Sequence, residues 1–167
     1  MPRSRLCRSV GVAPLRGSRE ARQGCSFALV VIDTNVVLDL FVFDDPAVAP
    51  LRAALVEGRV GWIATEAMRE ELRRVLDYPH LARRLGETGS VAVLAAFDRH
   101  TRRVEPADKA PFTCRDPDDQ RFIDLAVAQG AALLSKDAHV LALARRLARV
   151  GIRVSRSWGP QAEEASA

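Results

Sequence analysis

The feature that most constrains the fold is an apolar run that ends in an acid, at residues 29–33. Four aliphatic residues, three of them β-branched, precede Asp33 without interruption. Such a run predicts a strand that is buried on both faces, as in a parallel sheet. Ligands bind outside the carboxyl ends of the strands in such sheets, so Asp33 is expected to face a site. The alternative is that Asp33 or Thr34 only caps the helix that follows.

The length of 167 residues suits one domain, and the net charge of +4 is unevenly distributed. Residues 1–24 carry six arginines against Glu20 alone, whereas the rest of the chain carries nineteen basic and twenty acidic residues. The basic character therefore belongs to a tail and gives no argument that the body binds nucleic acid. We predict a disordered basic tail at residues 1–25, a folded domain at 26–158 and a flexible tail at 159–167.

The three cysteines are odd in number and lack the spacing of a metal motif; they are Cys7, Cys25 and Cys114. We therefore expect free thiols in a reducing compartment and a cytoplasmic protein. No apolar run approaches the roughly 20 residues that would span a bilayer, so no membrane association is expected.

Strands and helices are expected to alternate along the chain. The expected strands lie at 29–32, 60–64, 102–104, 132–134 and 152–154; the expected helices lie at 36–42, 47–57, 66–77, 81–85, 90–100, 116–129 and 138–150. Thr65 and Ser90 are the predicted caps of two of these helices. The alternation, with short turns, predicts an α/β fold: a three-layer α/β/α sandwich around a mainly parallel central sheet.

Glu71 has an unusual position in the expected helix at 66–77. With about 100° per residue, one arc of that helix holds the apolar side chains Met68, Leu72, Val75 and Leu76. Glu71 lies at the margin of this arc, where a carboxylate is costly unless it is paired or binds a cation. The helical pattern leaves both interpretations open: a boundary acid paired with an arginine, or a ligand.

Two further acidic motifs lie in the last third of the chain. Asp116-Pro117-Asp118-Asp119 is a favoured helix start, although Asp119 lies on a row with Ile123, Ala126 and Val127, so its side chain is expected to face the sheet edge. Ser135-Lys136-Asp137 follows a predicted strand as Asp33 does, so parallel strands would bring Asp33 and Asp137 to one edge. Asp137 is equally suited to cap the next helix.

These carboxylates would repel one another unless divalent cations neutralise them. Mg²⁺ and Mn²⁺ prefer oxygen ligands, and the sequence shows no cluster of histidine or cysteine that would favour another metal. A bound ion of this kind supplies what phosphodiester hydrolysis needs, namely an activated water and positive charge near the phosphate.

The order of the motifs resembles the PIN-domain (PilT N-terminus) family, in particular the VapC-like toxins of toxin–antitoxin pairs. The matching stretches are Asp33-Thr34-Asn35, Glu71, Asp116-Pro117-Asp118-Asp119 and Ser135-Lys136-Asp137, within residues 28–156. The resemblance implies a PIN-like sandwich and an endoribonuclease that depends on Mg²⁺ or Mn²⁺, with one or two ions. It also implies a toxin role, a cognate antitoxin as partner and a homodimer.

The resemblance assigns roles to individual residues. It implies that the catalytic metal is surrounded by four acids, namely Asp33, Glu71, Asp119 and Asp137, with Asp116 as an accessory ligand. Thr34, Asn35 and Ser135 would orient ligands or the scissile phosphate. Lys136 stands where the family usually has glycine, so it would either hold a phosphate or displace one metal ion.

Two other interpretations remain. One is a non-catalytic PIN-like module that binds RNA or protein. The other is a haloacid-dehalogenase-like phosphatase, which is disfavoured because Asn35 stands where that chemistry needs a second Asp. The histidines His80, His100 and His139 are isolated and are expected at surface or boundary positions. The arginines Arg145, Arg146, Arg149, Arg153 and Arg156 form either a groove for RNA phosphates or a solvated face.

Overall fold

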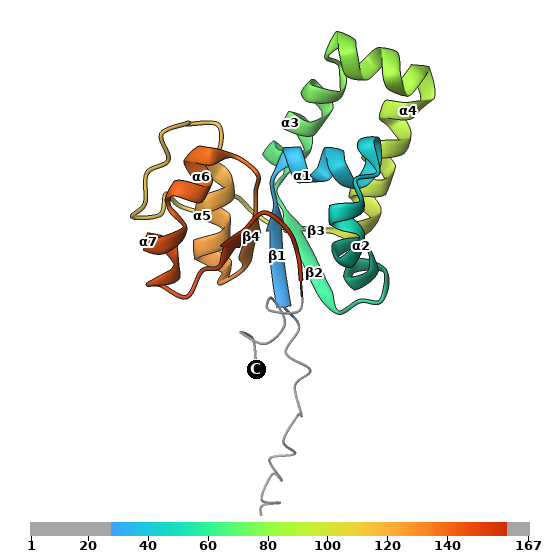
Figure 1. Cartoon of the computed structure of the whole chain (residues 1–167). Coiled ribbons are helices and arrows are strands. Elements are labelled where there is room, and N and C mark those ends of the chain that lie inside the picture. Colours follow the sequence, from blue (N-terminus) through green and yellow to red (C-terminus); the bar gives the residue numbers. More distant parts are fainter. Residues whose placement is uncertain (1–27, 160–167) are drawn as a thin grey trace, which may run out of the picture.

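The described part of the chain, residues 28–159 of a computed structural model, is built on a five-stranded sheet. Its strands are β1 (Ala28–Ile32), β2 (Val60–Ala64), β3 (Thr101–Arg103), β4 (Ala132–Leu134) and β5 (Val154–Ser155). Their order is β3-β2-β1-β4-β5, and every neighbouring pair is parallel. The carboxyl ends of the strands therefore meet at one edge, the top of the sheet in Figure 1.

Helices cover both faces of this sheet, as the predicted α/β/α sandwich requires (Figure 1). One side carries α2 (Ala49–Val56) and the second half of α4 (Pro79–His100), and the other side carries α5 (Gln120–Gln129), α6 (Ala138–Ala142) and α7 (Ala144–Ala148). From the top of β1, the chain enters α1 (Thr34–Leu38), a π-helical turn η1 (Asp39–Phe43) and a 3-10 turn η2 (Pro46–Val48). α3 (Glu66–Leu76) and the start of α4 extend beyond the top edge.

β1 lies at the centre of the sheet, and its apolar residues are the most enclosed. Val30 and Val31 have no exposed surface, as expected for a strand buried on both faces. On β2, Trp62 packs edge-on against Phe97 of α4, with 4.9 Å between the ring centroids. β1 is therefore at the centre of the core, and β2 packs directly against α4.

Some predicted boundaries were wrong. The two helices predicted at 81–85 and 90–100 are present within α4, which is interrupted at Gly86 by a non-helical φ of 67° and ψ of −178°, but both begin earlier than predicted. Ser90 lies inside this helix and does not cap it. The helix predicted at 138–150 is divided at Leu143 into α6 and α7. Thr65 does cap α3, because its hydroxyl accepts a hydrogen bond from the amide of Met68.

The tails predicted at residues 1–25 and 159–167 lie outside the described residues, except for Gly159. Cys7 and Cys25 also lie outside them, whereas Cys114 is a free, buried thiol. Among the helices between residues 28 and 159, none has the length and apolarity to cross a membrane.

Candidate metal centre

Asp33 and Asp137 lie together at the carboxyl edge because β1 and β4 are neighbours. Ile32 is in register with Leu134, so Asp33 and Ser135 leave the two strands at the same level. The Ser135 hydroxyl donates to Oδ2 of Asp33 at 2.6 Å, and it accepts a hydrogen bond from the Asp137 amide at 3.0 Å. Ser135 therefore links the two acids, and Asp33 itself is only 2% exposed.

Glu71 reaches the same edge from α3. The hydroxyl of Thr34, at the start of α1, donates to Oε1 of Glu71 at 3.0 Å. Nη1 of Arg121 lies 3.4 Å from the other carboxylate oxygen, Oε2, which is buried and accepts no hydrogen bond from the described part of the chain. The side chain of Glu71 is 19% exposed, so the position predicted from the helical pattern is correct. The ion pair with Arg121 agrees with the interpretation of Glu71 as a paired boundary acid. Its proximity to Asp33 agrees with the interpretation of Glu71 as a metal ligand.

Asp116 and Asp119 come from the turn that leads into α5. The side chain of Asp116 accepts a hydrogen bond from the amide of Asp118 at 2.9 Å, so Asp116 opens the turn and α5 itself begins only at Gln120. Asp119 precedes that helix but makes no capping hydrogen bond with its side chain. Capping therefore does not account for the position of Asp119.

Asp137 both caps a helix and lies beside another acid, the two possibilities that the sequence left open. Its carboxylate caps α6, where Oδ1 accepts from the amide of His139 at 2.6 Å and from the amide of Val140 at 3.4 Å. It also lies close enough to Asp119 to share a hydrogen bond with it. The cap fixes Asp137 at the edge of the acidic group and does not remove it from that group.

The acids raise one another's pKa, and the effect is largest at Asp119. Burial is the main cause there, followed by repulsion from Asp33, Asp137 and Asp116 and by the hydrogen bond with Asp137. Together these raise the pKa of Asp119 from its ordinary 3.8 to about 7. Burial therefore makes the larger contribution to this pKa, and the neighbouring carboxylates add to it.

The pKa values of Asp33 and Glu71 are raised as well. At Asp33 burial is the main cause and repulsion from Asp137 adds to it, while the hydrogen bond from Ser135 opposes the rise. At Glu71 burial again dominates, and the Thr34 hydroxyl and the Arg121 guanidinium oppose it. All three acids are therefore more easily protonated than in an unfolded chain, and a bound cation would reverse that preference.

The donor set fits a hard divalent cation. The acids come to this edge from the end of β1, α3, the turn before α5 and the loop after β4, and they supply carboxylate oxygens, which Mg²⁺ and Mn²⁺ prefer. Repulsion from three neighbouring acids contributes to the raised pKa of Asp119, and a cation would relieve it. Among the described residues, the ligand atoms of Asp116, Asp119 and His139 lie within 4.8 Å of one another, whereas Asp33, Glu71 and Asp137 do not belong to a group of this kind.

Lys136 forms ion pairs with two acids that lie outside the metal-centre group. Its ammonium lies 2.6 Å from Oδ2 of Asp39 in η1 and 3.1 Å from Oδ2 of Asp45 before η2. The side chain of Asp39 is only 13% exposed, so the pair ties the loop after β4 to the turn after α1. These two ion pairs hold Lys136 in its position in the ligand-free protein.

Lys136→Ala is therefore expected to destabilise the protein. Loss of the two pairs should lower the free energy of unfolding by about 1 kcal/mol, measured by urea titration. Lys109→Ala, at an exposed loop lysine, is the control and should leave the free energy of unfolding unchanged. Equal free energies of unfolding for Lys136→Ala and the unaltered protein would show that the two ion pairs contribute nothing to stability.

Sequence reasoning missed His139. It was expected to be isolated, yet one of its ring nitrogens and one carboxylate oxygen each of Asp116 and Asp119 all lie within 4.8 Å of one another. The available signal was its place two residues after Asp137, in the first turn of the helix that Asp137 caps. Asn35, by contrast, is exposed at the start of α1.

The arginines near the C-terminus are spread over different surroundings. Arg145 and Arg153 line a hollow along α7 and β5, whereas the guanidinium of Arg146 lies 5.6 Å from the ring centre of Phe112. At least Arg146 thus covers an apolar side chain.

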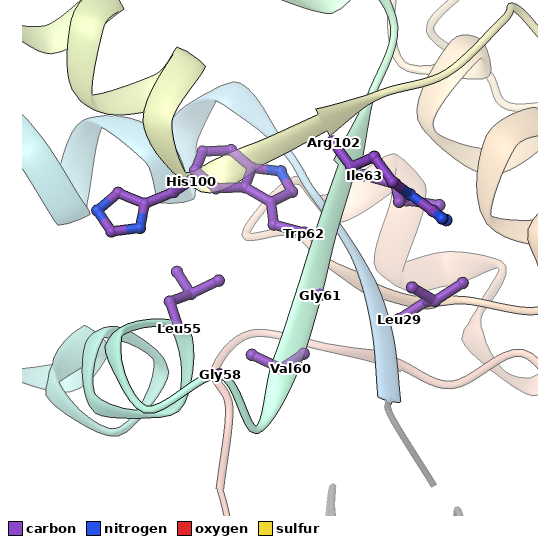
Figure 2. A pocket seen from close by; sticks show the side chains of 9 residues that line it. All are labelled: Leu29, Leu55, Gly58, Val60, Gly61, Trp62, Ile63, His100 and Arg102. Carbon is purple, nitrogen blue, oxygen red and sulfur yellow. The ribbon is translucent and has the colours of Figure 1, made fainter. Parts of the chain in front are cut away.

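Two hollows differ in their relation to the acids. A cleft of about 250 Å³ adjoins the metal centre and is lined by Glu71, Arg74, Val75, Tyr78, Asp118 and Arg121. A larger hollow of about 330 Å³ surrounds the start of β2. Figure 2 shows its lining, with Leu55, Trp62 and His100 on one side of the strand and Leu29, Ile63 and Arg102 on the other. It contains no acid, so it is separate from the metal centre.

The fold and the centre define an α/β protein with a group of acids at the carboxyl edge of a parallel sheet. A family model described as PIN domain matches residues 29–139. The chain therefore belongs to the PIN-domain family.

A comparison with solved structures agrees with this fold. The chain is similar to one in the crystal structure of VapBC2 from Rickettsia felis bound to a DNA fragment from their promoter. The TM-score is 0.53 and the identity 12%, and the match covers 78% of this chain and 99% of that chain. No curated protein matches the sequence.

Proposed function

We propose that the protein is a metal-dependent endoribonuclease that hydrolyses RNA phosphodiester bonds with Mg²⁺ or Mn²⁺. The observation that carries this proposal is the convergence of Asp33, Glu71, Asp119 and Asp137 from four separate segments on one edge of the sheet. Membership of the PIN-domain family supports the same chemistry.

The chain's own residues would position the ion and the substrate. The four acids would hold the ion, with Asp116 as an accessory ligand. The hydroxyls of Ser135 and Thr34 donate to the carboxylates of Asp33 and Glu71, and they would thereby orient these two ligands. When bound, the ion supplies a water of lowered pKa and stabilises charge on the phosphate. Asn35, exposed beside Thr34, is available to donate to a phosphate oxygen.

The cleft beside Glu71 suits a single-stranded nucleic acid. Tyr78 is 52% exposed and can stack on a base, and the guanidinium of Arg74 can contact a phosphate. Because Glu71 belongs both to this cleft and to the metal centre, a strand bound there would pass next to the ion.

We further propose that the protein is the toxin of a toxin–antitoxin pair, that it binds a cognate antitoxin and that it forms a homodimer. The support is the similarity of its fold to a chain of the VapBC2 complex. The cellular role rests on the fold alone, whereas the nuclease proposal also rests on the site.

A non-catalytic binding module is the second candidate. It is favoured by the structural roles that two of the acids already have, because Glu71 pairs with Arg121 and Asp137 caps α6. Titration calorimetry with Mn²⁺ separates the two candidates, since a module of this kind needs no metal. Absence of binding at millimolar Mn²⁺ would favour it.

The proposed function predicts that cleavage of RNA stops when the metal is removed. Labelled single-stranded RNA should be cut with Mg²⁺ or Mn²⁺ present, left intact with EDTA, and cut again when metal is restored. The products should carry 5′-phosphate and 3′-hydroxyl ends, which end-specific enzymes can read. Cleavage that continues at the same rate in EDTA would contradict the proposal.

A further inference from the structure

His139 lies beside the acidic centre, on the side of Asp116 and Asp119. The three residues each offer a ligand atom, and these atoms lie within 4.8 Å of one another. Ligands on opposite sides of one ion lie about 4 Å apart, since each bond is about 2.1 Å long. Small movements of the side chains would therefore bring all three onto one ion.

The surroundings of His139 hold it in place without using all its bonding capacity. Its amide donates to Oδ1 of Asp137, so the residue is fixed in the first turn of α6. Its ring atom Nδ1 is buried but makes no hydrogen bond with any described residue. The side chain as a whole is 42% exposed, so an ion from solvent can reach it.

A nitrogen ligand changes the choice of metal. Mg²⁺ takes oxygen ligands almost without exception, whereas imidazole together with carboxylates suits divalent ions of the first transition row. The other candidate ligands of the centre are all carboxylates, so His139 is the group that would distinguish the two classes of ion.

We propose that Asp116, Asp119 and His139 form a second metal position with one nitrogen ligand, and that it selects Mn²⁺ or a similar transition ion over Mg²⁺. This inference rests on the proposed function in that Asp119 is shared with the nuclease centre. The competing explanation is a surface ion pair, because Nδ1 of His139 lies 3.5 Å from Oδ1 of Asp137.

The test measures metal binding to the whole chain without RNA. Pulsed electron paramagnetic resonance of the Mn²⁺-loaded protein should show coupling to an imidazole nitrogen, and His139→Gln should abolish that coupling. By calorimetry, His139→Gln should weaken Mn²⁺ binding by about tenfold or more and change Mg²⁺ binding by less than about twofold. His80→Gln, at an exposed histidine of α4, is the matched control and should leave both unchanged.

The outcomes separate this inference from the proposed function. Absence of nitrogen coupling in the unaltered protein, or its persistence in His139→Gln, overturns the inference, and so does equal weakening of both ions. RNA cleavage measured on the same samples tests the nuclease independently. Nitrogen coupling without any RNA cleavage would keep the metal position and reject the ribonuclease.

Discussion

Asp33→Asn is expected to lower the rate constant for RNA cleavage by at least about 10³-fold, or about 4 kcal/mol of transition-state stabilisation. Asp33 is the most enclosed of the acids, and it lies between Ser135 and the neighbouring carboxylates. An amide at this position keeps the shape and can still accept the Ser135 hydrogen bond, but it cannot balance the charge of a cation. The loss should therefore appear in both Mn²⁺ affinity and turnover.

The same substitution should not destabilise the metal-free protein. Burial raises the pKa of Asp33, which means that the fold disfavours its ionised form at neutral pH. A neutral amide removes this cost, so the midpoint of urea unfolding at pH 7.5 should stay the same or rise. Inactivity combined with unchanged stability separates a metal ligand from a residue that only supports the fold.

Asp108→Asn, at an exposed loop acid, is the control of the same type and should leave cleavage and Mn²⁺ binding unchanged. If Asp33→Asn cleaves RNA at the full rate, the proposed mechanism is wrong, whatever the other acids do.

The sequence predicted the sheet and its site edge because these depend on local pattern and on one general rule. The apolar run before Asp33 and the shorter one before Ser135 each indicate a strand, and parallel pairing then brings Asp33 and Asp137 together. The margin position of Glu71 follows from helical periodicity alone. None of these inferences requires knowledge of a distant contact.

The contacts that the sequence did not predict join distant segments. Lys136 meets Asp39 and Asp45 only because η1 and η2 bring these acids to the loop after β4, and nothing near Lys136 in the sequence signals them. His139 was judged as a single residue, although the cap at Asp137 fixes it beside the turn before α5.

The metal-free protein should become less stable as the pH rises from about 5 to about 7.5. Asp119 has a pKa of about 7 in the folded protein against 3.8 as its ordinary value, so the folded state binds more protons across this range. Asp33 and Glu71 shift in the same direction. The full shift of Asp119 would be worth about 4 kcal/mol, but its partial exposure to solvent reduces the expected loss to about 1–2 kcal/mol.

This range of pH isolates the metal centre from surface acids whose pKa values are lowered by arginines or, at Asp45, by the backbone amide of Ala47 and then by Lys136. The pKa is lowered at three such acids, Asp98, Glu70 and Asp45. Above about pH 5 they are therefore ionised in both the folded and the unfolded chain. Their contribution to stability is lost only at lower pH. The slope between pH 5 and 7.5 should therefore largely disappear in Asp119→Asn and persist in Asp108→Asn.

Divalent metal should reverse the sign of this pH dependence. An ion binds the deprotonated acids, so Mn²⁺ at about 100 times its dissociation constant should add about 2.7 kcal/mol at pH 7.5 and less at pH 5. Urea titrations at both pH values, with Mn²⁺ and with EDTA, measure the four free energies of unfolding directly. A metal-free protein that gains stability between pH 5 and 7.5 would show that the acids are balanced by the protein itself. That result would remove the electrostatic reason for a metal at this edge of the sheet.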